Sequence, residues 1–169
     1  FHPGPTLSTP KNAHCIIDIG NGNFMLIGGY PNSAQVFLLD WATWTWTNLP
    51  EMNFPRLYQS CGKVGNDVIV AGSGNGGSTN TTEIFSLDTM TWSMGPDVPG
   101  NTRKFQDATN GVVQLQDTFR IIGGGDEEYL DTIFEFDPEN YAWITRPEKL
   151  VTAREFHVVV PIPNNFLDC

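Results

Sequence analysis

The sequence is poor in positive charge. Its 169 residues include 19 acidic and only 9 basic side chains, which gives a formal net charge of -10. Such a surface repels phosphate backbones, so sequence-independent binding to nucleic acid is excluded. The chain also has no apolar run near the roughly 18 residues that a membrane-spanning helix needs, and we expect no membrane span.

Helical periodicity is missing as well. No stretch of the chain repeats apolar side chains at the three- and four-residue spacing of an amphipathic helix. Short runs rich in Val, Ile and Phe occur instead, bounded by Gly, Asn, Asp or Pro: Cys15–Ile19, Phe24–Ile27, Val36–Leu39, Val68–Ala71, Ile84–Leu87, Phe119–Ile122, Ile133–Phe136 and Val158–Ile162. Short strands at this spacing predict an all-β sandwich, barrel or propeller.

Cysteine is scarce, and its 3 residues cannot all pair within one chain. We interpret Cys15 and Cys61 as small buried thiols of the core. Cys169, at the terminus, is placed to form a disulfide with a partner segment if the setting is oxidising.

The start of the chain and one tripeptide bear on location. The sequence begins at Phe1 and lacks the layout of a signal peptide, so either a leader has been removed or the chain is part of a longer one. Asn80-Thr81-Thr82 is an N-glycosylation acceptor in a stretch that we expect to be an exposed loop. We therefore expect an extracellular or lumenal protein, with a cytoplasmic location as the alternative.

One pattern occurs three times in the same order: a strand ending in glycine, a strand ending near an aspartate, and a tryptophan. The glycines are Gly28 and Gly29, then Gly72 with Ala71 in place of the first glycine, then Gly123 and Gly124. The aspartates are Asp40, Asp88 and Asp137, and the tryptophans are Trp46, Trp92 and Trp143. A turn and an arginine precede each new repeat, at Arg56, Arg103 and Arg154.

This pattern resembles kelch repeats over His14 to Ile162. The resemblance implies a portion of a β-propeller in which each repeat is one four-stranded antiparallel blade. It divides the chain into an N-terminal extension (1–13), repeats at 14–56, 57–103 and 104–154, a partial repeat at 155–162, and a tail (163–169). The partial repeat matches the innermost strand of a fourth blade.

The resemblance assigns structural roles to the repeated residues. The glycines mark places where neighbouring backbones approach too closely for a β-carbon. The tryptophans fill the wedges between adjacent blades. The aspartates suit a side chain that bonds back to the backbone of its own turn.

Three blades and one further strand cannot close a ring, because propellers have about four to eight blades. Open flanks would leave apolar surface and strand edges uncovered. We therefore expect an oligomer or a part of a larger chain. A protein partner, a second copy or another segment of the same propeller would complete the ring.

Proteins of this kind bind ligands at loops on one face of the ring, here Tyr30–Gln35, Ser73–Thr82 and Gly125–Asp131. The candidate ligand-binding residues are Tyr30, Arg56, Arg103, Asp126, Glu127 and Arg154. Because the arginines recur at one repeat position, a structural role is the favoured alternative for them. If they bind a ligand, the guanidinium groups select an acidic partner.

The acidic loop Asp126-Glu127-Glu128, with Asp131 nearby, has the oxygens that a hard cation prefers. It lacks the alternating spacing of a calcium loop, so we interpret it as a solvated acidic loop and predict no metal site.

Catalytic motifs are missing too: the chain has no Ser-His-Asp arrangement, no phosphate loop and no cysteine pair at zinc spacing. We predict a non-catalytic kelch module for protein–protein interaction or structural assembly, without a cofactor. The alternative is a fragment of a carbohydrate-active or galactose-oxidase-like propeller enzyme whose catalytic residues lie outside this chain. The histidines and tyrosines that such a site would use show no metal-gathering spacing: His14, His157, Tyr30, Tyr58, Tyr129 and Tyr141.

Overall fold

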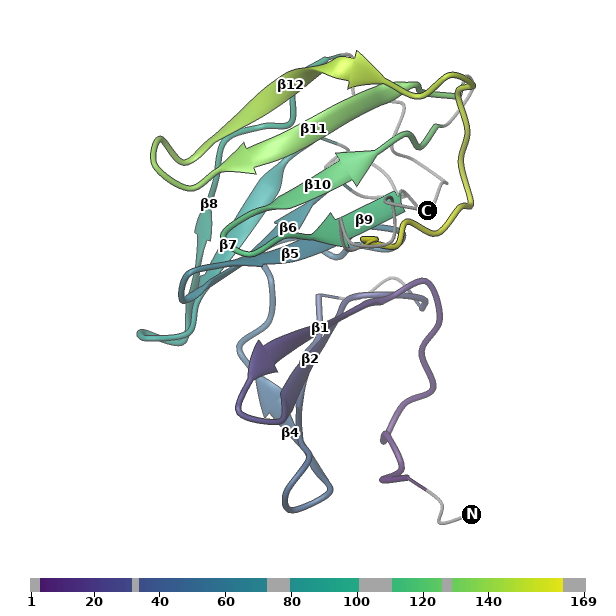
Figure 1. Ribbon diagram of the computed structural model, residues 1–169. Coiled ribbons are helices and arrows are strands. Elements are labelled where there is room, and N and C mark those ends of the chain that lie inside the picture. The colour runs from purple at the N-terminus through teal and green to yellow at the C-terminus, as the bar shows by residue number, and fades with distance from the viewer. Residues whose placement is uncertain (1–3, 32–33, 73–79, 101–110, 126–128, 163–169) are drawn as a thin grey trace.

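The computed structural model describes residues 4–31, 34–72, 80–100, 111–125 and 129–162. All regular structure in these ranges is β, arranged as three four-stranded antiparallel sheets. Each sheet uses four strands that are consecutive in sequence (Figure 1). The prediction of an all-β chain with three four-stranded blades is therefore confirmed.

Each blade is a meander. Blade 1 contains β1 (Cys15–Gly20), β2 (Asn23–Ile27), β3 (Val36–Asp40) and β4 (Thr45–Leu49). Blade 2 contains β5 (Ser60–Val64), β6 (Asp67–Ala71), β7 (Thr82–Ser86) and β8 (Thr91–Met94). Blade 3 contains β9 (Gly111–Gln114), β10 (Phe119–Ile122), β11 (Thr132–Asp137) and β12 (Ala142–Lys149).

Antiparallel pairing gives each blade two distinct ends. The turns between its first and second strands and between its third and fourth strands lie at one end, which we call the turn edge. Each second strand ends and each third strand begins at the opposite end of its blade, which we call the loop edge.

The blades stack through their first strands, because β1 contacts β5 and β5 contacts β9. Since successive side chains of a strand point to opposite faces, β6 contributes side chains to the cores shared with both neighbouring blades. Val68 and Val70 pack in the core shared with blade 1, whereas Ile69 and Ala71 pack in the core shared with blade 3. Blade 2 is therefore buried on both faces.

The glycine repeat has a different register in blade 2 from the one expected. Gly28, Gly72 and Gly123 have left-handed φ angles of 65°, 77° and 65°. Each donates its N–H to a carbonyl at the start of the third strand of its blade: Gly28 to Gln35 at 3.0 Å, Gly72 to Thr81 at 3.2 Å, and Gly123 to Thr132 at 2.9 Å. The prediction that Ala71 replaces the first glycine is wrong by one residue, because Gly72 itself occupies that position.

The aspartate repeat is also displaced in blade 2. Asp40 and Asp137 accept hydrogen bonds from the backbone of the turns that follow them, as expected. In blade 2 the strand before the turn ends at Ser86, whose Oγ accepts the Thr89 N–H at 3.4 Å. Asp88 lies inside the turn and accepts a hydrogen bond from Asn66 instead, so its predicted equivalence with Asp40 is wrong.

The two described cysteines are not free thiols. Cys15 in β1 and Cys61 in β5 form a disulfide, with Cα atoms 6.2 Å apart. The prediction of separate core thiols is wrong, because the first strands of adjacent blades run beside each other and bring the residues within disulfide range. Cys169 lies outside the described residues.

The repeat tryptophans face the preceding blade or segment. Trp143 is buried, and its indole N–H donates to Thr82 Oγ1 of blade 2 at 3.0 Å. Trp92 is half-buried in the core between blades 1 and 2 and donates to the Pro50 carbonyl at 2.8 Å. Trp46, on the flank of blade 1, donates to the Pro5 carbonyl at 3.1 Å.

The segment 155–162 forms no β-ladder, so the strand expected there is not present. It nevertheless begins as blade 2 begins. Gly124 donates to the Arg154 carbonyl at 2.9 Å, just as Gly29 donates to the Arg56 carbonyl at 2.8 Å. The segment packs against β9, where His157 and Val159 lie close to Gly111, but no described strand pairs with its backbone.

Candidate functional site

The predicted ligand-binding residues have unequal access to solvent. Tyr30 lies at the loop edge with 61% of its surface exposed, and its N–H donates to the Asn12 carbonyl at 2.7 Å. Arg154 is also exposed, whereas Arg56 is completely buried. The others, Arg103, Asp126 and Glu127, lie outside the described residues.

Arg56 is held by its own blade. Its Nη1 donates to the carbonyls of Gly72 at 2.7 Å and Thr81 at 2.9 Å, and its Nη2 donates to Thr81 Oγ1 at 2.8 Å. Its Nε donates to the Glu83 carboxylate at 3.1 Å. A guanidinium that is enclosed and bonded in this way is not accessible to a ligand, so the structural alternative describes Arg56.

Glu83 accepts hydrogen bonds from the segment that connects blades 1 and 2. Its carboxylate accepts the N–H and the side-chain amide of Asn53, both at 2.7 Å, and the Phe54 N–H at 3.2 Å. Burial lowers the pKa of Arg56, and the charge and hydrogen bond of Glu83 oppose that shift. The pair therefore ties the connecting segment to blade 2, while the Arg56 carbonyl binds blade 1.

Arg154 lies at the matching position after blade 3, and the described residues do not enclose it. Its backbone contacts blade 3 as Arg56 contacts blade 1, and among the described residues its Nε donates to the Thr152 carbonyl, at 3.2 Å. The loop carbonyls and the carboxylate that surround Arg56 come from the blade that Arg56 begins. Among the described residues, no blade supplies them to Arg154.

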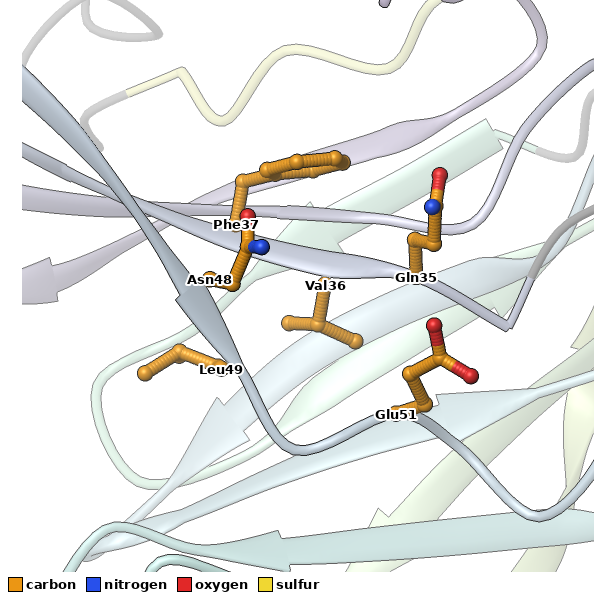
Figure 2. Close-up of a pocket in the computed structure, with 6 residues that line it drawn as sticks. All are labelled: Gln35, Val36, Phe37, Asn48, Leu49 and Glu51. Carbon is orange, nitrogen blue, oxygen red and sulfur yellow. The ribbon is translucent and has the colours of Figure 1, made fainter. Parts of the chain in front are cut away.

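A small hollow lies beside β3 and β4 of blade 1, lined by Gln35, Val36, Phe37, Asn48, Leu49 and Glu51 (Figure 2). Figure 2 shows the polar ends of Gln35 and Glu51 on one side of it and Phe37 and Leu49 on the other. Its volume of about 40 Å³ has room for only about one or two water molecules. It is too small for a ligand.

A larger cleft lies between blades 1 and 2 at the turn edge, with a volume of about 310 Å³. Its apolar side chains are those of Ile19, Leu38, Leu49, Leu87 and Met90. Three asparagine side chains, Asn21, Asn23 and Asn66, add amide groups, and none of the described residues that line the cleft is charged. Sequence reasoning missed this cleft, because the residues that line it come from two blades and are distant in sequence.

The histidines and tyrosines considered for a radical-oxidase site have separate surroundings. His14 begins blade 1, and burial together with Lys11 lowers its pKa. His157 follows blade 3, with both ring nitrogens buried and without hydrogen-bond partners among the described residues. Within those residues no group of three or more His, Cys, Asp or Glu could hold a metal ion. The same ranges contain no helix with the length and hydropathy to cross a membrane.

Three meander sheets that stack through their first strands define a β-propeller type of protein. A family model described as the KLHDC2/KLHL20/DRC7 Kelch-repeats domain matches residues 2–167. The chain belongs to the kelch-repeat family, whose domains typically form propeller modules that mediate protein interactions.

Two curated relatives carry the same repeats. An F-box/kelch-repeat protein of Arabidopsis thaliana is 29% identical over 119 residues, which cover 70% of this chain and 31% of the relative. A putative F-box/kelch-repeat protein of the same plant is 32% identical over 88 residues, which cover 50% of this chain and 30% of the relative. The matches thus span about a third of the length of these relatives.

Proposed function

We propose that this chain is a non-catalytic kelch propeller module for protein–protein interaction or structural assembly, which completes a ring with another copy or segment. The observation that best supports this proposal is the exposed apolar surface of segment 155–162. Its outward side chains are Phe156, Val158, Val160 and Ile162, with 63%, 87%, 69% and 64% of their surface exposed. The matching strand of blade 2, β5, is almost completely buried.

Arg154 indicates which chemical groups a partner that covers segment 155–162 would carry. In blade 2, the same repeat position is surrounded by two loop carbonyls, a hydroxyl and a carboxylate. A β-segment that pairs with 155–162 would bring equivalent acceptors to Arg154, because the loop carbonyls belong to every blade. The partner at this flank is therefore a β-edge that covers apolar side chains and offers oxygen acceptors to one guanidinium.

Sedimentation analysis of the purified chain at micromolar concentration tests ring completion. We expect a particle heavier than the 18.7 kDa monomer. Val158→Asp should weaken association by at least about tenfold, because a carboxylate would be buried without a partner. Met94→Asp changes a 51% exposed side chain of β8 and serves as the matched control. A folded monomer, or equal effects of the two substitutions, would overturn the proposal.

We also propose an extracellular or lumenal location, which the Cys15–Cys61 disulfide supports because such bonds persist in oxidising compartments. The glycosylation acceptor differs from the exposed loop that we expected. Asn80 is half-buried and donates to Asp97, and Thr82 is buried in β7. Mass spectrometry of protein from its natural source should show a glycan on Asn80 and the disulfide. Unmodified Asn80 together with reduced cysteines would contradict this location.

A further inference from the structure

The cleft between blades 1 and 2 has a counterpart that is closed. At the turn edge between blades 2 and 3, Tyr141 reaches back from the β11–β12 turn, and its hydroxyl donates to Asp67 at the start of β6. The Phe136 ring meets the Tyr141 ring edge to face, with centroids 5.7 Å apart. A phenol with a hydrogen-bond acceptor thus closes this wedge.

The strand pairings identify the matching residues in the open wedge. Asn23 pairs with the last residue of β3, and Asp67 pairs with the last residue of β7, so both begin the second strand of a blade at the same place. Met90 and Tyr141 each have a left-handed φ, of 55° and 49°, at the same position of their turns. Asn23 therefore replaces Asp67, and Met90 replaces Tyr141.

These two replacements leave the cleft open. Met90 carries no hydroxyl, and its side chain lines the cleft instead of crossing it to Asn23. Among the described residues, the Asn23 side chain makes no hydrogen bond. Its amide can accept a hydrogen bond as Asp67 does, and it can also donate one.

We propose that this cleft binds a tyrosine side chain of a protein partner. The ring would contact the apolar side chains of both blades, with the Met90 thioether as a favourable neighbour. The phenolic hydroxyl would donate to the Asn23 carbonyl oxygen, as Tyr141 donates to Asp67. The uncharged lining suits a neutral phenol better than an ionised group. That the tyrosine belongs to a protein rests on the proposed interaction function, whereas the phenol site does not.

A nuclear magnetic resonance titration with the blocked peptide acetyl-Gly-Tyr-Gly-amide tests the site. We expect amide shifts confined to residues that line the cleft, in the β1–β2, β5–β6 and β7–β8 turns and at Leu38 and Leu49. Binding should be about five- to tenfold weaker for the phenylalanine peptide, which lacks the hydroxyl. Shifts elsewhere, or equal binding of the two peptides, would overturn the proposal. Binding of p-cresol as tight as that of the tyrosine peptide would overturn its assignment to a protein partner.

Two matched substitutions locate the binding. Met90→Tyr supplies a phenol from the protein's own turn, as in the neighbouring wedge, and should abolish peptide binding while the spectrum remains that of a folded protein. Met94→Tyr adds the same ring outside the cleft and should leave binding unchanged. Retained binding in Met90→Tyr would contradict the site. Met90→Tyr should not change the particle mass, so failure of the cleft and failure of ring completion are separate results.

Discussion

At the scale of single residues, Arg56 shows how burial decides a role that residue type leaves open. Arginine at a repeated position is compatible with ligand binding and with blade packing. The guanidinium of Arg56 donates its hydrogen bonds to Glu83 and to loop carbonyls of blade 2, inside the protein. The sequence predicted the repetition, but the enclosure depends on residues that come 16 to 27 positions later.

We expect Arg56→Gln to lower the free energy of unfolding by about 3–5 kcal/mol, because Glu83 would remain as an uncompensated buried carboxylate. Urea denaturation measures the change. Arg146→Gln removes a guanidinium from a partly exposed ion pair and should cost less than about 1 kcal/mol. Similar losses in the two variants would contradict the importance of burial.

The hydrogen bond to Asp67 raises the pKa of Tyr141 from its ordinary value of 10.0 to about 12. The folded state therefore favours the neutral phenol, and this contribution to stability is present below pH 10 and is lost as the pH rises through about 12. Tyrosinate absorbance should show a late-titrating group that is missing in Tyr141→Phe. An unchanged late step in the variant would contradict the assignment.

At the scale of elements, the blade is the unit that sequence predicts best. Strand periodicity, turn residues and the tryptophan positions are local, and they predicted the three four-stranded sheets that the structure contains. The register inside blade 2 was harder to predict from sequence, since Gly72 can be aligned with either the first or the second glycine of the pairs in blades 1 and 3. Only the hydrogen bond from Gly72 to Thr81 decides between them.

The Cys15–Cys61 bond joins two blades whose first strands are otherwise held by packing. The cysteines are separated by 46 residues, so the loss of loop entropy in the unfolded chain contributes about 4 kcal/mol. We expect the double variant Cys15→Ser and Cys61→Ser to lose about that much stability in urea denaturation. Adding reductant should lower the stability of the wild type and leave that of the double variant unchanged.

At the scale of the whole molecule, the blades differ in how much of them is covered. Blade 2 lies between two cores, whereas the outer strands β4 and β12 are mostly exposed. Stability in such an open stack is highest where both faces are buried.

Hydrogen exchange should reflect this order. We expect the amides of β6 and β7 to exchange most slowly and those of β4 and β12 to exchange fastest among the strands, because opening blade 2 exposes both cores. Mass-spectrometric exchange on the Val158→Asp variant, in which association is weakened and the flanks are uncovered, measures the order. Equal protection in all three blades of this variant would contradict it.

The sequence by itself determined the all-β class, the three repeats and, in blades 1 and 3, the residues that end or cap their strands. These features follow from side-chain alternation and turn chemistry over a few neighbouring residues. The tertiary structure alone decided the disulfide, the burial of Arg56 and the difference between the open and closed wedges. Each of these depends on contacts between residues distant in sequence, such as Arg56 with Glu83, Cys15 with Cys61 and Tyr141 with Asp67. At one turn position, Met90 thus lines an open cleft between blades 1 and 2, whereas Tyr141 closes the matching space between blades 2 and 3.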